Sequence, residues 1–212
     1  MPSPKAMTGV VAYVAPLLKA AGFRRFGTTF NRVAEPGLIH VVGFQAGKWG
    51  DEFTVNLCVY VREIDELFTS SWNRSVAGVP GVDRGVKEYE GWLRARLGEI
   101  PPGGRDLWWK YTNLDAAVAD IAARLQTDAA PAFDATVSRN AVLAWWRDRE
   151  RQPFGWQLEP RAPLGAALLM KQSGAVDEAQ AVVDALCVET QGTAFHHVVS
   201  VLAEEIGVKP CG

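Results

Sequence analysis

The sequence has few cysteines, no long apolar run and almost no excess of charge, and each absence narrows the class of protein. Its three cysteines, Cys58, Cys187 and Cys211, are an odd number without the spacing of a disulfide framework. We therefore expect free thiols and a reducing, cytoplasmic location. No segment approaches the ~20 consecutive apolar residues of a membrane-spanning helix, so we expect no membrane association.

The charge balance argues against nucleic acid as a partner. The 22 basic and 24 acidic residues leave a formal net charge of −2, which provides no general attraction to a phosphate backbone. Apolar residues make up 48% of the chain and charged residues 22%, so a chain of 212 residues can bury a core without disulfides or metals. These values are typical of a globular protein.

The sequence also lacks a recognisable catalytic, cofactor or metal-binding motif. The segment GFQAGK, at 43–48, resembles a phosphate-binding loop, but Trp49 follows where Ser or Thr would hold magnesium, and a strand is expected next instead of a helix. The adjacent pair His196–His197 cannot bind one ion from a single helix face. We therefore predict no cofactor, no metal and no catalytic residues.

One catalytic alternative depends on how two strands pair. His40 and Cys58 would form a Cys–His dyad if their strands brought the two side chains together. However, Cys58 is flanked by Leu57 and Val59, which favours a buried structural thiol. No partner completes a nucleophilic site around either residue.

The first part of the chain predicts a helix followed by a sheet. Residues 8–21 carry apolar side chains at helical spacing, with a kink or restart at Pro16 and an end at Gly22. Residues 63–87, which are rich in glycine, are expected to form a long loop. Alternating or apolar segments predict strands at 28–33, 38–45, 53–62, 92–97 and 107–111.

The second part of the chain predicts helices. Helical stripes begin at Asn113 and at Ser138, residues 151–161 are read as a connector, and an alanine- and leucine-rich helical region follows. The expected fold is α+β, with an N-terminal helix on an antiparallel sheet of about four or five strands. The predicted organisation is an α+β domain at 1–150, the connector, and an all-helical extension at 162–212.

Several fragments resemble a known family in their order along the chain. They are LLKAAGF, TTFNR, FTVNLCVYV, RARLG and DLWW. This series is similar to that of the bacterial domain-of-unknown-function 4304 proteins, over about residues 12–130, although Cys58 stands where glycine is common. The resemblance implies an α+β fold with an antiparallel sheet and no catalytic residues. Some members lie near bacterial toxin–immunity systems, which implies a protein-binding role.

The segment YEGWLRARLGE contains the candidate binding residues. On a strand, Trp92, Arg94 and Arg96 share one face, where two guanidinium groups and an indole suit a carboxylate, a phosphate or an acidic partner. The alternative is a solvated face on which the arginines pair with nearby acids such as Glu88, Glu90 or Asp106 and stack on Trp92. On a helix, the arginines would instead be scattered.

Trp108 completes the predicted binding set, because adjacent tryptophans on a strand point to opposite faces and only one of Trp108 and Trp109 can enter the core. The loop 78–85 is expected to border the surface. The leading functional hypothesis is a non-catalytic protein-binding module, with an immunity-type role as one version. The alternative is an enzyme or a binder of small anions that uses a cleft between the sheet and the helical extension.

Overall fold

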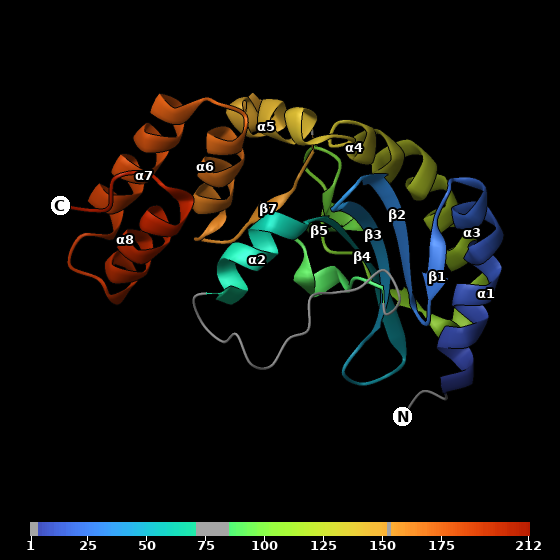
Figure 1. Ribbon diagram of the computed structural model, residues 1–212. Helices are drawn as coiled ribbons and strands as arrows, with labels where there is room; N and C mark the ends of the chain where they lie inside the picture. Colours follow the sequence, from blue (N-terminus) through green and yellow to red (C-terminus); the bar gives the residue numbers. More distant parts are fainter. Residues whose placement is uncertain (1–3, 71–84, 152–153) are drawn as a thin grey trace. The chain divides into compact units, whose positions relative to one another are not determined.

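A seven-stranded sheet organises the first part of the chain in the computed structural model, which describes residues 4–70, 85–151 and 154–212 (Figure 1). The strand order is β1-β2-β3-β4-β5-β7, and β6 pairs with the beginning of β4. The pairings from β1 to β5, and of β6 with β4, are antiparallel. The strands are β1 (Arg24–Phe26), β2 (Thr29–Glu35), β3 (Leu38–Ala46), β4 (Glu52–Val61), β5 (Leu93–Arg96), β6 (Trp109–Lys110) and β7 (Gln157–Leu158).

The two faces of the sheet differ because side chains alternate along each strand. Register pairs Val41 with Cys58 and His40 with Val59, which assigns these two pairs to opposite faces. The His40 face also carries the apolar alternation of β4 and packs on helices. The Cys58 face continues on β5, where Cys58 pairs with Arg94 and Asn56 pairs with Arg96.

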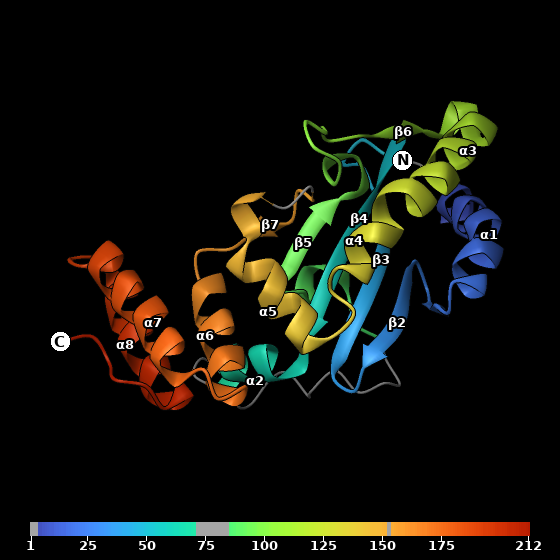
Figure 2. The ribbon, with the colours of Figure 1, turned by 90° about the horizontal axis from the view of Figure 1, so that it is seen from above.

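Helices cover the His40 face (Figures 1 and 2). Buried Val10, Val14 and Leu18 give α1 its apolar stripe, and Phe133 of α4 stacks on His40 with ring centroids 4.6 Å apart. A π-helical segment joins α3 to α4 just before Pro131, whose missing N–H cannot continue an α-helical hydrogen-bond ladder. The helices are α1 (Pro4–Ala20), α3 (Leu114–Arg124), the π-helical η4 (Leu125–Ala129), α4 (Ala130–Asp134) and α5 (Arg139–Arg147).

The chain divides into two compact units. The first unit holds α1, β1 to β6 and α3 to α5, and the second holds α2 and α6 to α8. The division between them falls within β7, after Gln157. The helices of the second unit are α2 (Arg62–Ser70), α6 (Ala162–Gln172), α7 (Val176–Thr190) and α8 (Ala194–Ile206). None of the helices in the described ranges has both the length and the apolar character needed to cross a membrane.

A disulfide and a pair of hydrogen bonds fasten the C-terminal segment to α7. Cys187 of α7 is bonded to Cys211. The side chain of Gln180 accepts a hydrogen bond from the Lys209 amide at 2.7 Å and donates one to the Lys209 carbonyl at 3.2 Å. The expectation of three free thiols is therefore wrong for two of them, because the fold brings together cysteines that lie 24 residues apart.

The structure confirms the predicted α+β class and differs from the expected elements in several places. The sheet has more strands than expected, since β1 and β7 are too short to give a sequence pattern. Helix α1 runs through Pro16 without ending. Part of the predicted loop 63–87 is α2, where Ile64 and Leu67 supply a short buried stripe. Apart from Gly85, the loop 78–85 lies outside the described residues.

Candidate functional site

One part of the Cys58 face is covered by the segment that precedes β5. Buried Val86 packs with Ile39, Val41, Cys58 and Tyr60 to form a small second core. The segment then forms a 3-10 turn, η1 (Glu88–Glu90), which ends at Gly91, two residues before β5 begins. A Cβ at position 91 would lie 2.4 Å from the Cys58 side chain, so glycine is required for this close approach.

Asn31 holds the covering segment on the sheet. Its carboxamide donates to the Val86 carbonyl at 2.9 Å and accepts from the Val86 amide at 2.7 Å. Both contacts are buried and span 55 residues of sequence. Asn31 therefore supplies β2 with a sheet-like pairing to a segment that is not itself a strand.

Beyond this cover, the same face opens into a polar pocket of about 550 Å³. Strand β5 forms its floor with Arg94 and Arg96. The turns on either side of β5, η1 and η2 (Leu97–Glu99), supply one glutamate each. The lining residues are Gln45, Asn56, Leu57, Glu88, Tyr89, Arg94, Ala95, Arg96, Glu99 and Gln157.

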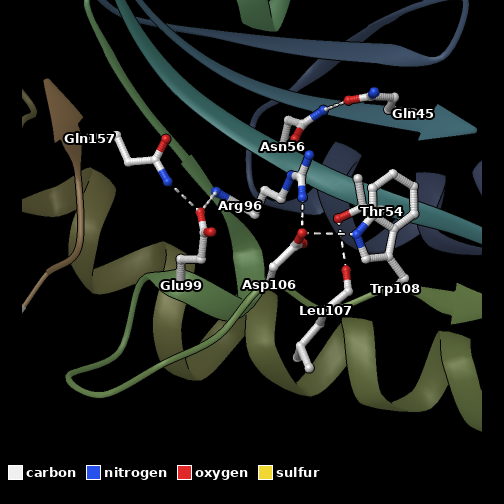
Figure 3. A network of polar contacts seen from close by, with 9 residues as sticks. All are labelled: Gln45, Thr54, Asn56, Arg96, Glu99, Asp106, Leu107, Trp108 and Gln157. Carbon is white, nitrogen blue, oxygen red and sulfur yellow. Dashed lines mark hydrogen bonds and ion pairs between the residues drawn. The ribbon is translucent and has the colours of Figure 1, made fainter. Parts of the chain in front are cut away.

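Two residues hold the Arg96 side chain in place (Figure 3). Its guanidinium forms an ion pair with Asp106 and lies over the Trp108 ring, 4.9 Å from the ring centroid. The Trp108 indole N–H donates to the same Asp106 carboxylate at 2.9 Å. This arrangement fixes the guanidinium while leaving its side chain partly exposed.

Glu99 joins the end of β5 to β7 (Figure 3). Its Oε2 atom accepts hydrogen bonds from the Arg96 backbone amide at 3.1 Å and from the Gln157 carboxamide at 2.8 Å. Across the pocket, the Asn56 carboxamide donates to the side-chain oxygen Oε1 of Gln45 at 2.8 Å. These bonds hold the side chains of Gln45, Asn56, Glu99 and Gln157 in place, which lowers the entropy cost of binding a ligand there.

The structure separates the predicted binding residues. Arg94 and Arg96 lie side by side on the open face, and β5 is a strand, as the favoured interpretation required. Trp92 precedes β5, is buried, and stacks on Trp146 of α5 at 5.7 Å, so it does not line the pocket. The expectation that it shares the arginine face is wrong because regular alternation begins only at Leu93.

Trp108 and Trp109 differ in burial, as expected of adjacent residues in an extended segment. Trp109 is buried and its indole N–H donates to Asp120 of α3 at 2.9 Å. Trp108 stays partly exposed and supports Arg96 from outside the pocket lining. The alternative that pairs the arginines with nearby acids is correct for Arg96 and Asp106, and the stacking partner is Trp108 instead of Trp92.

His40 and Cys58 do not meet, because register places them on opposite faces. Burial, with a smaller contribution from Glu88, raises the pKa of the Cys58 thiol well above its usual value. His40 accepts a hydrogen bond at Nδ1 from Arg32 and, by Nε2, donates to the Thr136 carbonyl at 3.0 Å. Burial and, to a smaller extent, Arg32 lower the pKa of His40 to about 4.

Within the described ranges, no group of three or more His, Cys, Asp or Glu side chains is placed to hold a metal ion. His196 hydrogen-bonds to the Cys187 carbonyl at 3.1 Å, and so it supports the junction of α7 and α8. The segment 43–48 spans the end of β3 and a turn, and β4 follows it, as expected of a sequence that is not a phosphate-binding loop.

Sequence reasoning did not predict the acidic and carboxamide groups of the pocket. Asn56 and Gln45 stand at polar positions of their strands, which is only a weak indication that they line a binding site. Glu88 and Glu99 were missed as pocket residues because nothing in the sequence shows that the turns beside β5 bend over its face. Gln157 had no signal, since it lies in a segment read as a connector.

Comparison with known proteins decides the family. A profile of the family described as domain of unknown function (DUF4304) matches residues 14–135, which is more than half of the chain. The chain belongs to the DUF4304 family. No match was found among curated proteins or solved structures. The DUF4304 segment runs from within α1 to the end of α4 and contains every lining residue of the pocket except Gln157.

Proposed function

We propose that this DUF4304 protein is a non-catalytic protein-binding module of the bacterial cytoplasm and that the polar pocket is its contact site. The observation that carries the proposal is the pair Arg94 and Arg96, presented on a rigid strand at the floor of a concave surface. Arginine is enriched where protein interfaces have their strongest contacts. An immunity-type role, in which the pocket engages a toxin, is one version of this function.

The preorganisation of Arg96 supports binding over a purely structural role. A single acidic partner would be enough to satisfy an arginine that only stabilised β5. The Arg96 guanidinium instead contacts both Asp106 and Trp108, and its backbone amide donates to Glu99. A guanidinium that is fixed in this way can donate hydrogen bonds to a partner's carboxylate with little loss of side-chain entropy.

The test is a pull-down from the source cell lysate with the purified protein. Arg94→Gln/Arg96→Gln removes both charges without placing a new carboxylate beside Asp106, and Arg105→Gln is the matched control because Arg105 is exposed and outside the pocket lining. We expect a stoichiometric protein captured by the native chain and by Arg105→Gln but lost with the folded double variant. Capture that is unchanged in the double variant would overturn the proposal.

The pocket volume favours a second candidate, a binder of small polar molecules. A cavity of about 550 Å³ lies within the range of small-ligand sites. All of its lining residues belong to the first unit. A ligand that raises the melting temperature of the native chain but not of Arg94→Gln/Arg96→Gln, in the absence of any protein partner, would favour this candidate.

The cytoplasmic part of the proposal has its own test, because disulfides are uncommon in reducing compartments. In the cytoplasm, Cys187 and Cys211 would be present as thiols. Alkylation of cells during lysis, followed by mass spectrometry, should label both residues if the location is cytoplasmic. Recovery of an unlabelled Cys187–Cys211 pair would point to an oxidising compartment.

A further inference from the structure

The pocket is lined by side chains of both charges. Arg94 and Arg96 lie on β5, Glu88 comes from the turn before this strand, and Glu99 from the turn after it. The charged groups of the lining therefore balance, and β5 carries cations between two anionic ends. A bare phosphate or sulfate placed at the arginines would also be repelled by the negative charges of both glutamates.

Both carboxylates are positioned by the fold. Glu88 lies against Gly43 of β3, where a Cβ would be only 2.6 Å from its Oε2. Glu99 is anchored through Oε2 to the Arg96 amide and to Gln157. An ionised carboxylate offers about four acceptor sites, so both groups retain capacity for a cationic donor from a ligand.

The remaining lining groups suit an amide backbone. The carboxamides of Gln45, Asn56 and Gln157 each present a donor and an acceptor, and they lie on three different strands around the charged residues. The Asn56–Gln45 and Gln157–Glu99 bonds orient these groups in advance. Such lining satisfies peptide N–H and C=O groups better than it satisfies an inorganic anion.

Resting on the proposed function, we propose that the pocket recognises a zwitterionic peptide-like group, with a carboxylate for the arginines and an ammonium or guanidinium for the glutamates, joined through amides. In a partner protein, this group is a segment with neighbouring acidic and basic side chains. The same chemistry in a free molecule is that of an amino-acid or dipeptide derivative.

The experiment compares three end-blocked dipeptides by nuclear magnetic resonance on the native chain. The probes are N-acetyl-Asp-Lys-amide, N-acetyl-Asp-Gln-amide and N-acetyl-Asn-Lys-amide, with sodium sulfate as an inorganic anion. The readout is the shift of the side-chain carboxamide signals of Asn56 and Gln157. We expect the zwitterionic probe to bind at least about tenfold more tightly than each singly charged probe.

One variant tests the contribution of a single pocket glutamate, Glu88. Glu88→Gln preserves shape and removes one anion, so it should weaken the zwitterionic probe by about tenfold and bring its affinity close to that of N-acetyl-Asp-Gln-amide. Glu150→Gln, at an exposed position outside the pocket, is the matched control and should change neither affinity.

Each remaining outcome has a defined meaning. Equal or tighter binding of sulfate or of the acidic probe would overturn the inference in favour of a plain anion site, and so would the absence of any shift up to about 10 mM probe. If these probes fail while the pull-down still loses its partner with Arg94→Gln/Arg96→Gln, the inference fails and the proposed function stands. If the zwitterionic probe alone binds and no protein is captured, the ligand is a free molecule.

Discussion

The carboxylate of Glu88 lies directly over the α-carbon of Gly43, with no room for a side chain between them. Gly43→Ala must therefore displace Glu88 by steric contact while every charge of the pocket is preserved. Because the nearest atoms are the end of a flexible side chain, we expect the free energy of unfolding in urea to change by less than about 1 kcal/mol. Partner capture, in contrast, should weaken.

A matched control for this substitution is Gly9→Ala, since a Cβ at Gly9 of α1 meets nothing within 4 Å. It should leave both stability and capture close to those of the native chain. If Gly43→Ala captured its partner as well as Gly9→Ala does, the position of Glu88 would not matter for binding.

Replacement of Asn31 should release the segment that covers one part of the Cys58 face. Asn31→Ala removes both hydrogen bonds to Val86 and leaves buried backbone groups without partners. We expect a loss of about 2–3 kcal/mol in the free energy of unfolding, measured in urea. The control Asn56→Ala removes a hydrogen bond at a partly exposed site and should lose less than about 1 kcal/mol. Equal losses would contradict the role of Asn31 as an anchor.

His40 should make the first unit less stable in mild acid. Burial lowers the pKa of His40 from 6.5 to about 4, and Arg32 adds to the effect. Because the folded pKa lies below the unfolded one, the stabilisation from neutral His40 is complete above pH 6.5 and is lost as the pH falls from 6.5 towards 4. The loss is on the order of 3 kcal/mol.

Urea unfolding between pH 7 and pH 5 measures this effect before most carboxylates titrate. The comparison is with His40→Gln, which retains a donor towards the Thr136 carbonyl but does not ionise. Between pH 7 and pH 5, the free energy of unfolding should fall more steeply with decreasing pH for the native chain than for His40→Gln. Parallel curves would mean that His40 does not control the acid sensitivity.

Reduction of the Cys187–Cys211 bond should loosen the C-terminal segment. The bond closes a loop between residues 24 apart in sequence, for which chain-entropy arguments give about 3 kcal/mol. Dithiothreitol should lower the unfolding free energy of the native chain and increase hydrogen exchange at Val208 and Lys209. The unfolding free energy of Cys211→Ser should not respond to the reductant, because this variant cannot form the Cys187–Cys211 bond. A native chain that ignores dithiothreitol would contradict the prediction.

The sequence predicted elements whose side-chain pattern is set locally. Strands β3 and β4 were identified because long alternating or apolar runs leave little choice of register. The arginine pair was identified for the same reason, since Arg94 and Arg96 must share a face once β5 is a strand. Helix α2 was missed because glycine-rich residues follow it and dominated the local pattern.

The features that sequence patterns did not predict depend on contacts between distant residues. The disulfide, the Asn31–Val86 pairing and the arrival of Gln157 beside Glu99 each join segments that are at least 24 residues apart. No local periodicity reports such contacts. The pocket follows from them, because its acidic and carboxamide groups are brought to β5 by turns and by an edge strand of two residues.

The most direct test of the pocket as the binding site is photo-crosslinking from two equally exposed tyrosines. Tyr89 lines the pocket and is 63% exposed, whereas Tyr13 on α1 is 65% exposed and outside the lining. Each is replaced in turn by p-benzoylphenylalanine and irradiated in the source cell lysate. We expect a discrete adduct from position 89 that disappears with Arg94→Gln/Arg96→Gln, and none from position 13. An adduct from position 13 alone, or one from position 89 that survives the arginine changes, would contradict it.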